Sequence, residues 1–399
     1  MGRHHPRRRW PLILAAILLL IFGSPLVYLW AKGPAFPEKL VVKVVPVDEP
    51  AVTEATQQLH DSLFIVDLHA DPLLWARDLS VESQRGHVDM PRLVRGNVGL
   101  QVFGVVTQIS PIHNHEYNPD LDMQGLVAFA QRWPMKTWFS IPNRGFYQAE
   151  KLRAVEAAAK GSFNIITTRQ DLQALIQQRQ QGNNVLGGLL AFEGMQVIDG
   201  KLALYEEFVK LGYRMMGLTH FMDTEAAGSR HGAEKYGLTA FGKELIRRME
   251  HDGIVLDLAH ASVQATTDAL AFAKQPVVVS HTGVKGVCDR LRNLSDEHIQ
   301  DVAKTGGVVG IGYWSSAACG MSPEQIVKSI RYVADLVGVD HVGLGSDYDG
   351  GVTVGFDTSR VALITQALKN DGFADGDIAK IMGGNVVRVL AEVLPDGGK

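Results

Sequence analysis

Eight apolar runs, each flanked by glycine or polar turn residues, recur along this 399-residue chain and constrain its fold more than any other feature. Most are separated by segments of helical period, such as residues 238–251, 262–274, 322–337 and 361–370. Strands that alternate with helices pair in parallel through right-handed crossovers, so eight such units predict a (β/α)8 TIM-like barrel of the α/β class. The runs are residues 64–71, 98–106, 185–193, 213–220, 253–260, 276–281, 306–314 and 341–347.

One interval is too long for a single crossover helix. Residues 107–184, between the second and third runs, contain helical patterns at 121–131, 148–160 and 170–180. We expect them to form a helical insertion between strands 2 and 3 rather than a separate domain. Residues 375–394 predict a closing helix with Asp375 as its N-cap.

Polar side chains that can bind metals or transfer protons end six of the runs. In a barrel of this kind the chemistry lies at the C-terminal ends of the strands. His69 and Asp71 follow the first run two residues apart, and i and i+2 side chains of a strand point the same way. A single ending of this kind means little, but six at one barrel mouth indicate a site. The endings are His69 with Asp71, Glu193, His220, His260, His281 and Asp347.

The number of ligands suggests two metal ions. His69, Asp71, Glu193, His260 and His281 are five ligands, more than one tetrahedral catalytic zinc site uses, because such a site keeps a position open for water. Two ions bridged by Glu193 would use all five. Paired ions about 3.5–4 Å apart activate a hydroxide held between them, which predicts a hydrolase.

The N-terminus predicts a membrane anchor. Four arginines within residues 1–9 precede an uncharged run at 10–30, long enough to cross a bilayer core of about 20 residues. The positive-inside rule keeps the arginines cytoplasmic. We therefore expect a basic cytoplasmic tail (1–9), a transmembrane anchor (10–30), a proline-rich linker without helix (31–50) and a catalytic barrel (51–395) on the periplasmic side. Secretion after signal-peptide cleavage is the alternative. The net charge of −4 provides none of the basic field of nucleic-acid binders.

The ordered motifs resemble the membrane dipeptidase family, renal-dipeptidase-like metallopeptidases of the amidohydrolase barrel group. The resemblance covers residues 52–394. Its motifs are Val66-Asp67-Leu68-His69-Ala70-Asp71, His87-Val88-Asp89-Met90-Pro91-Arg92-Leu93, Phe192-Glu193-Gly194, Leu218-Thr219-His220, Leu256-Asp257-Leu258-Ala259-His260, Ser280-His281, Arg292-Asn293 and Gly345-Ser346-Asp347-Tyr348-Asp349-Gly350.

The resemblance implies a role for each site residue. His69 and Asp71 would hold one zinc ion and His260 and His281 the other, with Glu193 bridging them. The remaining three side chains would act on the substrate: His220 on the oxyanion, Arg292 on the C-terminal carboxylate, and Asp347 as general acid and base. The resemblance further implies a dipeptide substrate, tolerance of a C-terminal D-residue, and a homodimer.

Two further predictions concern cysteines and histidines. Cys288 and Cys319 lie in the loops after the sixth and seventh strands, neighbouring positions on one barrel face, and we expect a disulfide between them. His113 and His115 are additional candidates for the mouth, and His87 is expected to pack under the barrel. The other helix or loop histidines are expected to be solvated: His60, His231, His251 and His298.

Two alternatives stay open at this point. The same residues would suit a binuclear hydrolase acting on another amide or ester, such as a β-lactam or an N-acyl amino acid. The second alternative is a metal-stabilised binding protein without turnover. Asp347 argues against it, because this residue is not one of the five predicted metal ligands.

Overall fold

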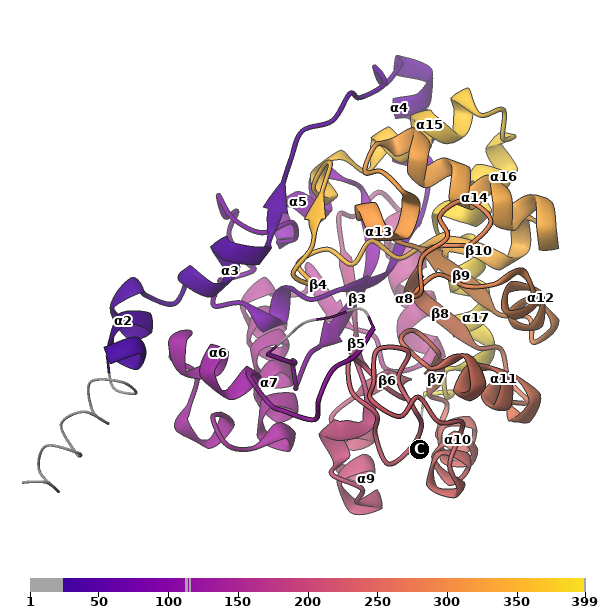
Figure 1. The fold of residues 1–399 in the computed structure, drawn as a ribbon. Helices are drawn as coiled ribbons and strands as arrows, with labels where there is room; N and C mark the ends of the chain where they lie inside the picture. Colours follow the sequence, from indigo (N-terminus) through magenta and orange to yellow (C-terminus); the bar gives the residue numbers. More distant parts are fainter. Residues whose placement is uncertain (1–23, 112–113, 115, 398–399) are drawn as a thin grey trace, which may run out of the picture.

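The computed structural model describes residues 24–111, 114 and 116–397, and its centre is a closed barrel of eight parallel strands (Figure 1). The strands pair in the order β3-β2-β10-β9-β8-β7-β6-β5, and a β3–β5 pairing closes the ring. The predicted barrel is confirmed, with one strand in each predicted run, although β8 extends one residue beyond the predicted end at 281. The strands are β2 (Ile65–Ala70), β3 (Val98–Val105), β5 (Leu186–Phe192), β6 (Tyr213–Gly217), β7 (Val255–Asp257), β8 (Val278–Thr282), β9 (Val308–Ile311) and β10 (Val342–Leu344).

Helices cover the barrel because their sequences begin with good caps and bury one face. The side chains of Thr239, Ser262 and Ser322 accept hydrogen bonds from backbone N–H groups in the first turns of α10, α11 and α14. Strands β2, β3 and β5 are buried along their whole length, as expected of parallel strands covered by helices. These helices are α10 (Ala240–Asp252), α11 (Val263–Phe272), α12 (Asp296–Lys304), α14 (Pro323–Val337) and α15 (Ala362–Asn370).

The insertion between β3 and β5 is helical as predicted, with two differences. Helix α7 (Ile141–Ala159) begins seven residues before the predicted start at 148, because Ser140 caps it and Pro142 stands in its first turn. A short strand, β4 (Phe163–Ile165), was not predicted and pairs in parallel with the start of β5. The other insertion helices are α6 (Gln124–Ala130), the 3-10 turn η3 (Met135–Thr137) and α8 (Arg169–Gln180).

The predicted closing helix is divided into α16 (Asp375–Ala379), the π-helical η7 (Lys380–Gly384) and α17 (Asn385–Val393). A Cβ atom on Gly383 would lie 2.1 Å from the carbonyl oxygen of Phe64, so only glycine lets this segment approach β2. The prediction of Asp375 as N-cap is wrong by one residue. Ala374 is the N-cap and Asp375 is the first helical residue.

The expectation that residues 31–50 contain no helix is wrong. They contain α3 (Phe36–Val41) and β1 (Lys43–Val44), which pairs with β11 (Thr353–Val354) just beyond β10. Pro37 fits because it stands in the first turn of α3, where its missing N–H costs no hydrogen bond. Glu38 is buried and its Oε1 lies 2.6 Å from Nε of Arg77, so the segment is ion-paired to the body of the barrel.

The predicted basic tail and residues 10–23 of the predicted anchor lie outside the described residues. Residues 24–30 are described and belong to α2 (Ser24–Lys32). Within residues 24–111, 114 and 116–397, the structure has no helix that is long and apolar enough to span a membrane.

Candidate metal centre

Three histidines from three strands converge on one carboxylate oxygen at the C-terminal end of the barrel. Oε1 of Glu193, directly after β5, lies 3.0 Å from Nε2 of His260, 3.3 Å from Nε2 of His281 and 3.6 Å from Nε2 of His69. Oδ2 of Asp71 lies 3.4 Å from the same nitrogen of His69. The fold therefore brings all five predicted ligands together, and all are buried.

Register shifts in β2 and β8 direct the side chains of His69 and His281 toward the site. Along β2, Asp67 pairs with Gln101 and Ala70 with Phe103, so Leu68 and His69 face a single residue of β3. In β8, Val279 pairs with Val309 and Thr282 with Ile311, so Ser280 and His281 face only Gly310 of β9. Such bulges redirect side chains and recur beside active sites. Strand alternation alone therefore does not explain how His69 and His281 reach the site.

Three residues in the loops at the mouth have positive φ values, which residues other than glycine rarely adopt. His260, Asp347 and Asp349 have φ values of 63°, 60° and 65°. Residues other than glycine enter this left-handed region at an energetic cost, which the surrounding structure must offset. Two of the three, His260 and Asp347, are predicted site residues.

Two glycines leave room for the ligands and were not predicted from the sequence. A Cβ atom on Gly104 would lie 2.2 Å from Oδ1 of Asp71, and one on Gly350 would lie 2.0 Å from Oδ1 of Asp347. Their φ values are not positive, so free space rather than turn geometry requires them. Sequence alone offers no signal that separates them from the other glycines.

A serine and an aspartate brace the site in the same way on two pairs of strands. Asp67 of β2 accepts hydrogen bonds from the backbone N–H (2.9 Å) and the hydroxyl (2.6 Å) of Ser346. Asp257 of β7 accepts the same pair from Ser280, at 2.9 and 2.5 Å. Nδ1 of His281 lies 2.9 Å from Oγ of Ser280. If Ser280 gives its proton to Asp257, His281 must donate from Nδ1, which leaves the lone pair of Nε2 directed at the site.

The electrostatics of the cluster suit a cation. Burial, reinforced by Asp71, raises the pKa of Glu193 well above its ordinary value. Burial lowers the pKa of both His260 and His281 well below the usual range, so both rings are neutral. Burial also opposes charge on His69, but the carboxylates of Asp71 and Glu193 raise its pKa to about 10. A divalent cation would supply positive charge to the carboxylates and accept the histidine lone pairs.

Buried atoms without partners support the same conclusion. Nδ1 of His69, Oδ1 of Asp71 and Nδ1 of His260 have no hydrogen-bond partner within the part of the chain that the structure describes. Such orphan atoms are costly to bury. Three overlapping sets of side chains have ligand atoms within 4.8 Å of one another: His69 with His281 and Asp347, Glu193 with His220 and His260, and His69 with Asp71 and Glu193. The residues present therefore fit bound metal.

The two predicted substrate-binding side chains also reach the cluster. Nε2 of His220 lies 3.4 Å from Oε2 of Glu193. Arg292 is buried over the ring of Trp314, at 4.8 Å from its centroid, and its Nη2 lies 3.1 Å from Nε2 of His260. One nitrogen lone pair cannot serve both partners, so a metal ion on His260 would release this part of the guanidinium for a substrate group.

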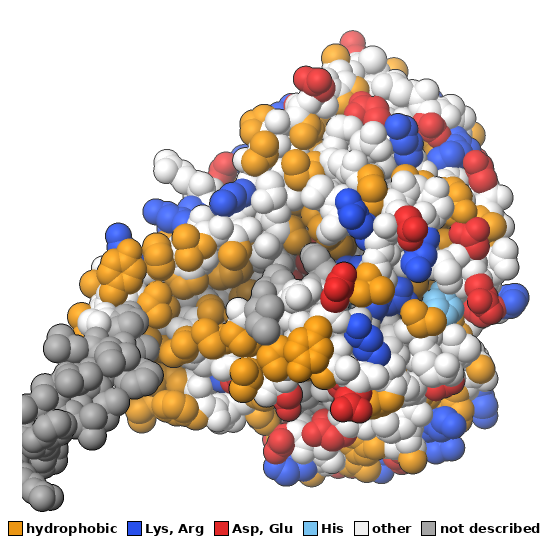
Figure 2. All heavy atoms as spheres, in the orientation of Figure 1, with side chains coloured by type: hydrophobic (Ala, Val, Ile, Leu, Met, Phe, Trp, Pro, Cys, Tyr) orange, Lys and Arg blue, Asp and Glu red, His pale blue; other side chains and the backbone are white. Residues whose placement is uncertain are grey.

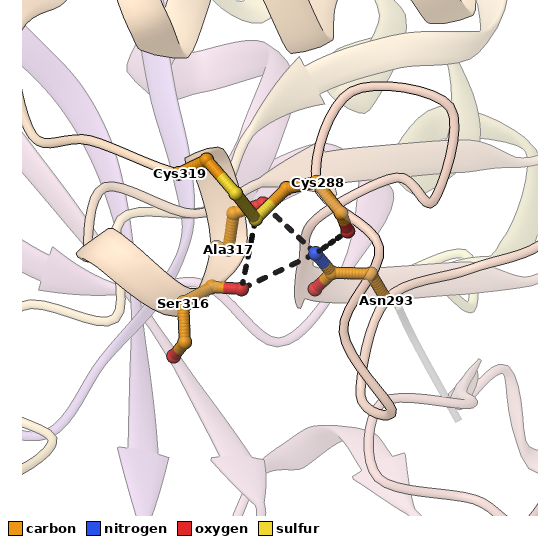
Figure 3. The surroundings of a disulfide bond; sticks show 5 residues. All are labelled: Cys288, Asn293, Ser316, Ala317 and Cys319. Atoms are coloured by element: carbon orange, nitrogen blue, oxygen red, sulfur yellow. Dashed lines mark hydrogen bonds between the residues drawn. A yellow bond between two sulfur atoms is a disulfide. The ribbon is translucent and has the colours of Figure 1, made fainter.

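The loop that carries Arg292 is held by the predicted disulfide, which is confirmed (Figure 3). Cys288 and Cys319 are bonded, with Cα atoms 5.4 Å apart. The side-chain amide of Asn293 donates to the carbonyl oxygens of Cys288 (2.7 Å) and Ala317 (3.0 Å). The bond and the amide together join the loop after β8 to the segment after β9, and so fix the backbone on both sides of Arg292.

Several expectations for the other histidines are wrong. His60, His231 and His298 are buried rather than solvated, whereas His251 is exposed as expected. The ring of His231 lies 5.3 Å from that of His260, which makes it a neighbour of the site that the sequence did not reveal. His87 does not lie under the barrel. It contacts the loop after β10 that contains Asp347 and Asp349, where its Nδ1 accepts a hydrogen bond from the backbone N–H of Asp349. His113 and His115 lie outside the described residues.

A closed parallel barrel with this cluster at its C-terminal end is typical of metal-dependent hydrolases. A comparison with known families gives the narrower assignment: the sequence profile of the membrane dipeptidase family, peptidase family M19, matches residues 53–395. The chain belongs to this family.

Individual relatives agree with the assignment. The chain is 32% identical over 222 residues to Dipeptidase aclJ of Aspergillus oryzae, an alignment that covers 52% of each protein. It is 24% identical over 358 residues to Dipeptidase tcpJ of Claviceps purpurea, covering 88% of this chain and 79% of that one. The fold is similar to that of a metallopeptidase from Rhodobacter sphaeroides, solved with a phosphinate mimic of the dipeptide L-Ala-D-Ala (TM-score 0.68, 22% identity, 83% of this chain and 99% of that one).

Proposed function

We propose that this protein is a zinc-dependent dipeptidase that hydrolyses the single peptide bond of substrates with a free C-terminal carboxylate. The proposal rests on one observation: the imidazole rings of His69, His260 and His281 converge on one oxygen of Glu193. A carboxylate in that position can bridge two cations. Sites with paired ions are typical of hydrolases.

The ligands divide into two groups around Glu193. His69 and Asp71 would hold one zinc ion, and His260 and His281 the other. When bound, the ions would polarise the scissile carbonyl and lower the pKa of a water molecule at the site. The protein supplies fixed ligands, exclusion of water and the proton transfers.

Asp347 is the proposed general acid and base. Burial raises the pKa of its carboxyl to about 7, and Asp71 acts in the same direction. A group with a pKa near the working pH can both take and return a proton. The backbone N–H of Asp347 donates to the carbonyl oxygen of His69 (3.1 Å), which fixes the loop beside the first ligand.

His220 and Arg292 would bind the two ends of the reacting group. We assign His220 to the oxyanion that develops on the scissile carbonyl. Its Nε2 approaches Oε2 of Glu193, whereas the three ligand histidines converge on Oε1. Arg292 would hold the C-terminal carboxylate of the substrate, a geometry that a guanidinium suits. Both groups lie beside His260, whose ring is 4.8 Å from that of His220 and whose Nε2 is 3.1 Å from Nη2 of Arg292, so we expect them to fit a substrate of one peptide bond.

We further propose that a D-residue is tolerated at the C-terminal position. The support is the relative from Rhodobacter sphaeroides, whose bound ligand mimics L-Ala-D-Ala and whose barrel has a similar fold.

We also propose that residues 10–30 anchor the protein in a membrane, with the barrel on the periplasmic side. The support is the uncharged apolar run preceded by four arginines.

The test is a screen of L,L and L,D dipeptides against the purified full chain, before and after chelation and zinc return. We expect hydrolysis of free dipeptides, loss of activity on chelation and recovery with zinc. A β-lactam and an N-acyl amino acid are included in the same screen. Turnover of these compounds without any dipeptide hydrolysis, or full activity without bound metal, would refute the proposal.

A further inference from the structure

An exposed apolar surface lies where the chain enters the described structure. Helix α2 exposes Val27, Tyr28 and Trp30, and the insertion adds three more large apolar side chains that face solvent. We name these six residues the apolar platform: Val27, Tyr28, Trp30, Leu126, Met135 and Phe139. Figure 2 shows hydrophobic side chains gathered on this face.

Ring contacts connect the Trp30 end of the platform with Phe139 through two aromatic residues of the insertion. The ring of Trp30 lies 5.2 Å from that of Phe129 in α6, and Phe129 lies 5.0 Å from Trp138. Trp138 in turn lies 6.4 Å from Phe139, which is 88% exposed. Six large apolar side chains exposed on one face of a soluble domain indicate an interaction site.

The charges around the platform match an interface between water and lipid. Helices α2 and α6 and the turn η3 contain no acidic residue. Lys32 lies over the ring of Tyr28 (5.1 Å), and Arg132 over that of Trp30 (5.0 Å). The Lys136 ammonium, also at the edge, lies 3.6 Å from Glu150. Aromatic rings with long basic side chains beside them are typical of residues at the membrane surface.

The sequence that precedes α2 indicates that a lipid bilayer is the partner of the apolar platform. The uncharged run that begins at Trp10 continues without a break into α2, so the platform lies at the end of the segment that we propose to cross the bilayer. The link to the barrel is packed rather than free, because Glu38 of α3 pairs with Arg77 and β1 pairs with β11. A bilayer that receives the run therefore lies within reach of the platform.

We propose that the apolar platform docks into the lipid headgroup region of the membrane that anchors the chain. The docking holds the barrel in one orientation on the bilayer, and the protein does not swing on a flexible tether. Interfacial residues of this kind enter the bilayer by about 5–10 Å. The inference rests on the proposed anchor and does not depend on which dipeptide is the substrate.

Depth-dependent fluorescence quenching tests the proposal in the full chain. The sequence has two cysteines and both are in the disulfide, so Phe139→Cys introduces one labelling site for an environment-sensitive fluorophore. Val263→Cys is the matched control, because Val263 is an exposed apolar residue on α11, at another side of the barrel. Both proteins are reconstituted into phosphatidylcholine and phosphatidylglycerol vesicles that contain acyl-brominated lipid. Dipeptide hydrolysis and thermal unfolding verify that both are folded.

We expect the label at 139 to be blue-shifted and quenched by brominated lipid several-fold more than the label at 263. Equal, water-like behaviour at both positions in protein that floats with the vesicles would overturn the docking and leave the anchor intact. Protein that does not float would overturn both. A label at 139 that is shielded from aqueous iodide but not quenched by brominated lipid would identify a protein partner, such as a second copy, and would also refute the bilayer as occupant.

Discussion

Nε2 of His260 lies 3.0 Å from Oε1 of Glu193, although the two residues come from strands that are separated by β6 in the barrel. At this distance either a proton, carried by the imidazole or by the carboxyl group, or a cation must lie between the two atoms. Burial lowers the pKa of His260 and raises that of Glu193, so neither group favours its charged form without a cation. A bound metal ion would take the place of the shared proton, and the first prediction tests this.

Removal of metal is expected to destabilise the protein as well as inactivate it. A ligand that binds only the folded state stabilises it by about 2.7 kcal/mol when its free concentration is 100 times its Kd. We expect thermal unfolding to move to lower temperature on chelation and to recover with zinc. His260→Ala should lose most of this zinc-dependent shift, and His251→Ala, a substitution at an exposed histidine, should retain it. An unchanged unfolding temperature after chelation would contradict a structural contribution of the metal.

Asp347→Asn is expected to reduce kcat by at least about 100-fold, because the amide cannot accept the proton that the carboxylate takes. Bound zinc, measured by elemental analysis, should stay at the parental level. Asp340→Asn, at an aspartate on the surface, is the control. A large loss of zinc in Asp347→Asn would instead identify Asp347 as a ligand, as its proximity to His69 and His281 allows.

Arg292→Met is expected to raise KM for free dipeptides by about 10- to 100-fold, the loss of a charge-assisted pair of hydrogen bonds. A dipeptide amide lacks the carboxylate, so its hydrolysis should change much less. The comparison of the two substrates separates substrate binding from damage to the site, because Arg292 also donates to the carbonyl oxygen of His281. Equal losses on both substrates would contradict the assignment of Arg292 to the carboxylate.

Ser280→Ala interrupts the path from Asp257 to His281 without removing a ligand. Residues that orient a ligating histidine typically contribute about 10- to 100-fold to metal affinity. We expect zinc affinity, measured by competition with a chelating dye, to fall in that range. Ser329→Ala removes a hydroxyl that is equally buried but lies on α14, and should leave zinc affinity unchanged. Equal affinity in Ser280→Ala would show that packing alone orients His281.

Acid is expected to destabilise the fold through His87. Burial lowers the pKa of this histidine in the folded protein, while the unfolded chain has a pKa of about 6.5. Below that pH the unfolded state takes up a proton that the folded state does not, so the free energy of unfolding decreases as the pH falls. His87→Gln removes this dependence. The difference in unfolding free energy between parent and variant should therefore shrink between pH 7.5 and 5, as measured by urea unfolding. A difference that stays constant with pH would contradict a neutral, buried His87.

The extent to which the structure was predictable differs from residue to residue. The eight runs and the polar residues that end them were visible because strand length, apolar content and turn residues are local properties. The start of α7 was missed because a single cap residue, Ser140, moved it. The helix in residues 31–50 was missed because Pro37 stands in the first turn, where proline is tolerated.

The sequence by itself determined the type of fold and the set of candidate ligands, because apolar runs, helical periods and the polar residues that end the runs are local features of the chain. Only the tertiary structure decided how those ligands converge. The bulges at His69 and His281, the space left by Gly104 and Gly350, and the braces of Asp67 and Asp257 all depend on which strands become neighbours. The residues that meet in these contacts are separated in the chain, by 23 positions for Asp257 and Ser280 and by 279 for Asp67 and Ser346. Their contacts follow from strand pairing, and no local pattern of residues records them.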